Sequence, residues 1–187
     1  MSKSPYDAQA QAAYKWWRSL RPRESNGRMI QGDRAAIAKL KRSSSVMEAA
    51  AEPATFDLFD KLAFKRDYAS RQLPRAAVIA GVLAHVTEQR SETLARAIGT
   101  PRGGEGSTPL ITPLRLKRLL AAREPDDVLI QFRRTVAILG GAANVRDLAI
   151  QLLAWTDDER GDLTRTRFAF DYHGADQFAP DVTAVAV

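Results

Sequence analysis

Apolar residues recur at helical spacing through most of this chain, whereas the period-two alternation of strands is nearly missing. Tyr14, Trp17 and Leu20, for example, are spaced as one face of a helix over about residues 5–21. The segment SNGR at 25–28 contains the Asn-Gly pair typical of hairpins, but no alternating run flanks it, and we expect residues 21–32 to form a loop. The pattern predicts an all-α fold of roughly nine helices.

Capping residues and prolines predict where the helices begin. Asp33 can accept hydrogen bonds from the first-turn amides of a helix that runs to about residue 43, and Asn144 can do so for a helix over 145–156. Proline is tolerated in a first helical turn, and this predicts further starts at Pro53, Pro74, Pro113 and Pro125. The most apolar segment, 74–89, is then expected to form the buried central helix.

A segment rich in glycine and proline divides the chain. Residues 99–112, GTPRGGEGSTPLIT, hold four glycines and two prolines. They predict a linker between an N-terminal helical half, 1–98, and a C-terminal helical half, 113–174, whose last helix fills about 158–172. Residues 175–187 are expected to be a tail. The 187 residues, 45% of them hydrophobic, suffice for one domain or for two small halves that share a core.

Basic residues are concentrated in the first two thirds of the sequence. The formal charge of the whole chain is +6, but residues 1–120 carry a net charge of +10 and residues 121–187 a net charge of −4. This asymmetry is typical of a protein with a basic side for nucleic acid and a more acidic end for protein partners. An ordinary basic globular protein would show the same total charge.

The residues that usually carry catalysis or bind cofactors are scarce. There is no cysteine, and the two histidines, His85 and His173, have no further histidine beside them, so we expect neither a metal site nor a catalytic triad. The glycines of GGEG, 103–106, lack the spacing of a phosphate-binding loop, and TDDERGD, 156–162, lacks that of a calcium loop. These features argue against an enzyme and against a cofactor or small-molecule substrate. No apolar run reaches the roughly 18 residues of a membrane span, so a cytoplasmic location is expected.

Two segments combine an apolar helical face with unopposed cations. In GDRAAIAKLKR, 32–42, Ile37 and Leu40 lie on one side of the helix, and the cations lie on the other. In PLRLKRLLAAR, 113–123, the leucines and the basic residues separate in the same way. The cations of these two segments, with the pair that follows in the next helix, are Arg34, Lys39, Lys41, Arg42, Arg115, Lys117, Arg118, Arg123, Arg133 and Arg134. Such arrays bind phosphates without reading bases, although each face alone could simply be solvated.

The order of the motifs resembles the CasB family, the small subunit of the type I-E CRISPR interference complex, Cascade. The matching motifs are YKWWRSL (14–20), GDRAAIAKLKR (32–42), VIAGVLAHV (78–86), LRLKRLL (114–120), FRRTVAILGGAANVRDLAIQLLAW (132–155) and RFAFDYHG (167–174). The resemblance implies a non-catalytic protein of two packed helical halves that assembles with other Cascade subunits and, head to tail, with a second copy of itself. It also implies a basic face that stabilises the R-loop, in which the guide RNA pairs with the target DNA and the other DNA strand is displaced.

Carried onto this sequence, the resemblance assigns nucleic-acid binding first to Arg34, Lys41, Arg42, Arg115, Arg118, Arg133 and Arg134, and second to Lys39, Lys117 and Arg123. One alternative is a helical adaptor between proteins, whose basic faces bind acidic partners or only keep it dissolved. A helix-turn-helix regulator is less consistent with the sequence, because no short turn leads into a helix start with clustered base-reading residues. Trp16 and Trp17 are adjacent and point about 100° apart, so either one is buried and one lies at an interface, or both are partly buried.

Overall fold

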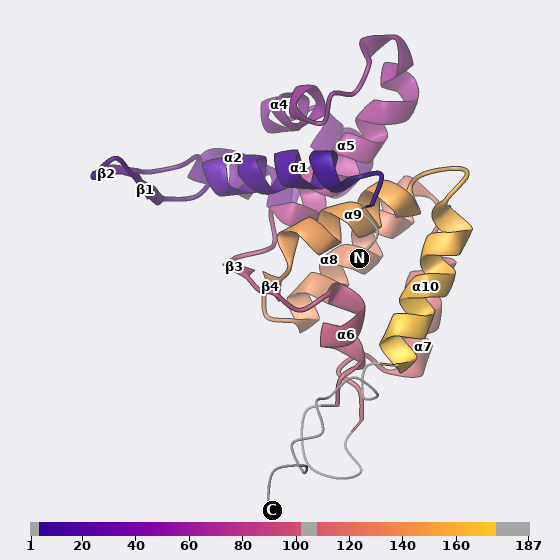
Figure 1. Ribbon diagram of the computed structural model, residues 1–187. Helices are drawn as coiled ribbons and strands as arrows, with labels where there is room; N and C mark the ends of the chain where they lie inside the picture. Colours follow the sequence, from indigo (N-terminus) through magenta and orange to yellow (C-terminus); the bar gives the residue numbers. More distant parts are fainter. Residues whose placement is uncertain (1–3, 102–107, 175–187) are drawn as a thin grey trace, which may run out of the picture.

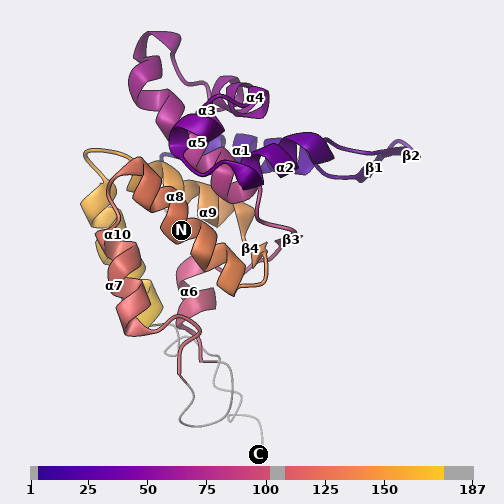
Figure 2. The same ribbon diagram turned by 180° about the vertical axis from the view of Figure 1, so that it is seen from behind.

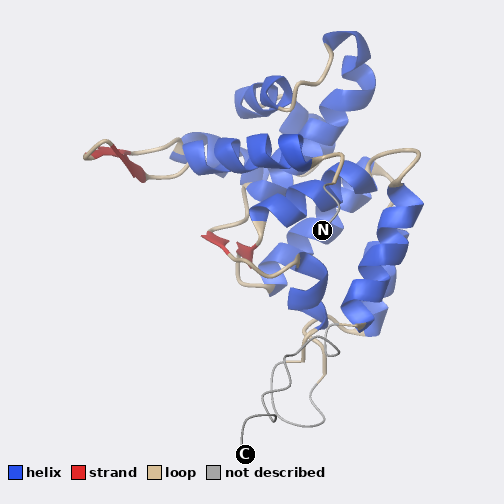
Figure 3. Cartoon of the chain, viewed as in Figure 1, coloured by secondary structure: helices blue, strands red, loops and turns tan. Residues whose placement is uncertain are grey.

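The computed structural model describes residues 4–101 and 108–174, and helices dominate it (Figures 1 and 3). The all-α prediction is confirmed, because ten α-helices and only short strands are present in the described part. The helices are α1 (Asp7–Ser19), α2 (Arg34–Arg42), α3 (Val46–Ala50), α4 (Pro53–Lys61), α5 (Ala69–Leu83), α6 (Leu94–Gly99), α7 (Pro113–Ala121), α8 (Pro125–Ile138), α9 (Val145–Trp155) and α10 (Gly161–His173). A 3₁₀ turn, η1 (Arg66–Tyr68), leads into α5. None of the described helices is long and apolar enough to cross a membrane.

Helix α5 lies at the centre of the packing. Every residue from Ala76 to Ala84 is buried, and the helix contacts α3, α4, α8 and α9. Helix α1 lies across α9, and α10 packs against α6, α7 and α9 (Figure 1). Helices from before and after residues 102–107 therefore contribute to one hydrophobic cluster. The division into two halves stays a prediction.

Tryptophan side chains link distant segments of this cluster. Trp16 and Trp17 are both buried, and their indole N–H groups donate to the carbonyls of Ala54 and Val86, each at 3.0 Å. Within this chain, neither indole faces solvent. Trp155 lies edge-on between Phe132 and Phe168, with ring centroids 5.0 and 5.4 Å away. Adjacent tryptophans can both be buried because α1 is covered by more than one neighbouring helix.

Two predicted boundaries are wrong. Pro74 does not open a helix but lies inside α5, which begins at Ala69 and ends at Leu83 rather than near residue 89. The chain continues from η1 directly into the first turn of α5, and Leu73, beside the proline, packs against the core. These tertiary contacts outweigh the cost of the one helix hydrogen bond that proline cannot donate. The starts predicted at Pro53, Pro113 and Pro125 are confirmed.

The segment 21–32, expected to be a loop, instead contains a hairpin. Strands β1 (Arg23–Ser25) and β2 (Arg28–Ile30) pair antiparallel and project from the body of the molecule (Figure 3). Asn26 and Gly27 have φ of 51° and 71°, the left-handed values that a tight hairpin turn requires. The strands are short and almost wholly exposed, which explains why no alternating apolar pattern marks them. A second pair, β3 (Glu88–Gln89) and β4 (Ala142–Ala143), is parallel.

Candidate nucleic-acid interface

Helix α2 presents its cations to solvent for local reasons. The carboxylate of Asp33 accepts a hydrogen bond from the Ala36 amide at 2.8 Å, as the sequence predicted, and this fixes where the helix begins. Leu40 is fully buried and Ile37 is half-buried against the core. The opposite side is therefore exposed, and it carries Arg34, Lys39, Lys41 and Arg42.

Helix α7 is built in the same way. The Thr112 hydroxyl accepts from the amide of Arg115 at the first turn, and Pro113 occupies the first helical position. Leu116 and Leu119 are buried. Arg115, Lys117 and Arg118 are consequently exposed on the solvent side.

The structure brings three predicted residues to one concave surface, which we name the α7–α8 groove. It has a volume of about 420 Å³. Its lining comprises Ile111, Arg115, Arg118, Leu119, Gln131, Arg134, Thr135, Ala137 and Ile138. Arg115 and Arg118 come from α7 and Arg134 from α8, so residues separated by at least sixteen positions in the sequence share one site. Among the residues that the structure describes, none that lines this groove is acidic.

Seven of the ten predicted cations make no side-chain hydrogen bond or ion pair with another described residue. They form what we call the unpaired set: Arg34, Lys41, Arg42, Arg115, Lys117, Arg118 and Arg134. All seven are exposed. The helices that carry them, α2, α7 and α8, lie on the side of the molecule that faces the reader in Figure 2. Cations without a partner remain available to an anion from outside.

Two of the other predicted cations pair with acids. The Lys39 ammonium lies 3.8 Å from a Glu52 carboxylate oxygen, and the Arg123 guanidinium lies 2.5 Å from Asp162. The Arg123–Asp162 pair is largely solvated and the Lys39–Glu52 pair is partly so, and each therefore contributes little to stability but lowers the local positive charge.

Arg133, the remaining predicted cation, donates hydrogen bonds to backbone carbonyls. Its guanidinium donates to Gly81 at 3.1 Å, to Ser43 at 2.5 Å and to Leu40 at 2.8 Å. The last two carbonyls lie at the C-terminal end of α2, where helix carbonyls lack partners inside the helix. Burial lowers the pKa of Arg133, but the group stays cationic. Arg133 therefore joins α8 to the end of α2.

Sequence analysis did not predict a second basic surface, which lies beside α2. A hollow of about 600 Å³ is lined by Lys41 together with Arg18, Arg21, Tyr14 and Trp17 among others. The Arg21 guanidinium lies 4.2 Å from the Trp17 ring and donates to the Val86 carbonyl, and burial lowers its pKa to about 10. The spacing of four residues between Trp17 and Arg21 was the only signal in the sequence.

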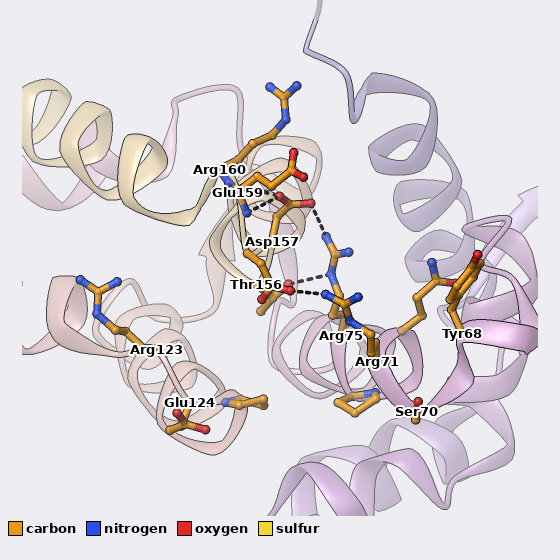
Figure 4. Close-up of a pocket in the computed structure, with 14 residues that line it drawn as sticks. Tyr68, Ser70, Arg71, Arg75, Arg123, Glu124, Thr156, Asp157, Glu159 and Arg160 are labelled. Carbon is orange, nitrogen blue, oxygen red and sulfur yellow. Dashed lines mark hydrogen bonds and ion pairs between the residues drawn. The ribbon is translucent and has the colours of Figure 1, made fainter.

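Another hollow, of about 690 Å³, differs in its charge pattern (Figure 4). Two of its arginines face acids across the hollow: Arg75 lies 3.5 Å from Asp157, and Arg71 pairs with Asp158. Arg75 also donates to the carbonyl of Leu153 and to the hydroxyl of Thr156. These contacts connect the start of α5 to the turn between α9 and α10, so we interpret this hollow as a structural junction.

The histidines and acids form no recognisable catalytic centre in the described residues. His85 Nε2 is buried without a hydrogen-bond partner, and burial, Arg133 and Lys41 lower its pKa to about 4. No group of three or more potential metal-ligating side chains comes together within the described parts of the chain.

Comparison with known proteins identifies the family. Residues 36–173 match the family model of CRISPR-associated protein Cse2. The match covers well over half of the chain and runs from the first turn of α2 to the end of α10. No curated protein matches the chain. The family supplies a structural small subunit of type I-E Cascade, the assembly that the sequence motifs indicated. The chain therefore belongs to the Cse2 family of CRISPR-associated proteins.

Proposed function

We propose that this subunit binds the nucleic-acid backbone without reading its sequence and thereby stabilises the R-loop of Cascade. It catalyses no reaction in this role. The observation that carries the proposal is the unpaired set, which places on α2, α7 and α8 seven exposed cations that have no acidic partner in the described part of the chain. Phosphates are the anions that such arrays bind best in a nucleic-acid assembly. The ligands would be the displaced DNA strand and the hybrid of guide RNA with target DNA.

A modest binding energy suffices for this role. The RNA–DNA hybrid of an R-loop is about as stable as the DNA duplex that it replaces, so contacts to the backbone can shift the balance. Base pairing supplies the sequence specificity, and the subunit needs none of its own. The proposal places the chain in the cytoplasm, beside other Cascade subunits and head to tail with a second copy of itself.

Salt dependence of binding tests the proposal. The affinity of the purified chain for a labelled single strand and a duplex would be measured across a salt series. The test variant carries Arg34→Ala, Arg42→Ala, Arg115→Ala and Arg118→Ala. We expect the affinity of the wild type to fall steeply as salt is added. In a plot of log affinity against log salt concentration, the slope of the variant should be smaller in magnitude by up to about 3.

A matched control removes the same number of charges elsewhere. Lys61, Arg66, Arg71 and Arg90 are exposed, and each pairs with an acid. Their fourfold alanine variant should keep nearly the wild-type slope, because these cations are already neutralised locally. Equal losses in both variants would mean that only net charge matters. No difference between wild type and test variant would favour the adaptor between proteins.

A further inference from the structure

The lining of the α7–α8 groove combines two kinds of surface. Arg115, Arg118 and Arg134 supply positive charge, and none has a partner among the described residues. Between them the lining is apolar, formed by Ile111, Leu119, Ala137 and Ile138. Ile111 and Leu119 are each 2% exposed, so they lie at the bottom of the groove rather than at its edge.

Backbone binding accounts for the arginines but not for the apolar lining. A phosphate gains nothing from contact with aliphatic side chains, and a flat array of cations would hold it equally well. The groove volume of about 420 Å³ lies in the range of sites for small organic groups. Its occupant should therefore join an anionic part to a flat or apolar part of comparable size.

We propose that the α7–α8 groove accepts one unpaired nucleobase of a single strand, while the adjoining phosphates bind Arg115, Arg118 and Arg134. This inference rests on the proposed function and specifies its ligand at this site. A duplex does not meet the requirement, since its bases are stacked and paired inside the helix. A single strand can turn a base outward onto the planes of guanidinium groups. The apolar part of such a base also leaves water when it lies against aliphatic side chains.

The polar groups of the lining indicate little selectivity among bases. The Thr135 hydroxyl already donates to the carbonyl of Gln131 at 2.9 Å, and Thr135 is 3% exposed. Gln131 supplies the only other uncharged polar side chain in the described lining. One amide can make two hydrogen bonds to the edge of one adenine, so it could favour a base at one position but cannot specify a longer sequence.

Comparison of two strands with equal charge tests the inference. The probes are a short oligothymidine and an abasic strand with the same number of phosphates, each titrated against the full-length chain at several salt concentrations. We expect the abasic strand to bind about 5-fold more weakly, the lower end of the range for bases stacked on aromatic rings, because this groove offers aliphatic side chains and guanidinium groups instead. Both strands should show the same dependence on salt, since the phosphate contacts are unchanged.

A variant that reduces the space in the groove provides the control. Ala137 is exposed and lies on α8, so Ala137→Leu should fold normally, since both residues favour helices, and should leave all three arginines in place. We expect it to reduce the difference between the two strands by weakening the intact strand alone. Arg134→Met should instead weaken both strands.

The outcomes separate this inference from the proposed function. If the abasic strand binds as tightly as the intact strand, the base does not enter the groove, while a steep salt dependence would still support backbone binding. If neither strand binds, both proposals are wrong. If an acidic peptide rich in glutamate and leucine displaces the intact strand and Ala137→Leu abolishes peptide binding, the groove is a protein site and the inference is overturned.

Discussion

Arg133 and Arg134 are adjacent in α8, yet their side chains have different surroundings. Arg133 donates to three carbonyls, two of them at the end of α2, whereas Arg134 is exposed in the α7–α8 groove. Arg133→Met leaves these carbonyls without their donor, and we expect it to lower the free energy of unfolding by about 2–4 kcal/mol. Urea unfolding followed by circular dichroism measures this loss.

Arg134→Met is the matched control at the residue scale. It removes the same group from an exposed position, so stability should change by no more than about 0.5 kcal/mol. Its effect should appear as weaker nucleic-acid binding instead. Equal destabilisation by the two substitutions would contradict the structural assignment of Arg133.

His85 should make stability depend on pH. Its pKa is lowered from 6.5 to about 4 by burial, by Arg133 and by Lys41, so between these values the unfolded chain binds the proton more readily than the folded one. Stability is therefore retained above pH 6.5 and lost as the pH falls toward 4, by about 1–2 kcal/mol between pH 7 and pH 5. Urea midpoints at the two pH values test this. His85→Leu cannot be protonated, and an unchanged drop in that variant would assign the effect to other groups.

At the scale of the element, α2 depends on its first residue. Asp33→Ala removes the oxygen that accepts from the Ala36 amide, and we expect a loss of about 1 kcal/mol in the free energy of unfolding. Asp33→Asn keeps a capping oxygen without the charge and should restore most of the stability. Thermal unfolding of the three proteins checks this order. A loss in Asp33→Asn as large as in Asp33→Ala would show that the charge, not the cap, matters.

Helix boundaries set by local chemistry could be predicted from the sequence. Asp33 and Asn144 cap α2 and α9 as expected, because a side-chain oxygen finds an amide three positions along the same chain. Pro74 and the hairpin at Asn26 could not be predicted, since they depend on packing around α5 and on a turn whose strands are exposed. Local rules therefore located most elements and failed where tertiary contacts decide.

The candidate site shows the same division. The exposed cations of α2 and α7 followed from helical spacing, because the apolar face of each helix fixes the solvent side. The contacts of these cations could not be predicted in this way. Arg123 pairs with Asp162, 39 positions away, and Arg134 lies in the same groove as Arg115 only because α7 packs beside α8. Which cations stay free of acids is a property of the folded chain.

At the scale of the whole molecule, the packing predicts one cooperative unit. Helix α1 packs on α9 and α5 packs on α8, so the segments before and after residues 102–107 bury each other's apolar surfaces. Neither segment should remain folded when the other unfolds. We expect a single two-state transition in urea, without a populated intermediate.

The tryptophans allow this to be tested from each end of the chain. Trp155→Phe leaves Trp16 and Trp17 as reporters of the N-terminal segment, and Trp16→Phe with Trp17→Phe leaves Trp155 as a reporter of the C-terminal segment. Each substitution lowers the stability of the protein by a different amount. The urea midpoints from fluorescence and from circular dichroism are therefore compared within the same variant. Coincident midpoints in both variants support one unit. Separate midpoints would instead show two halves that fold independently, as a linker at 99–112 would allow.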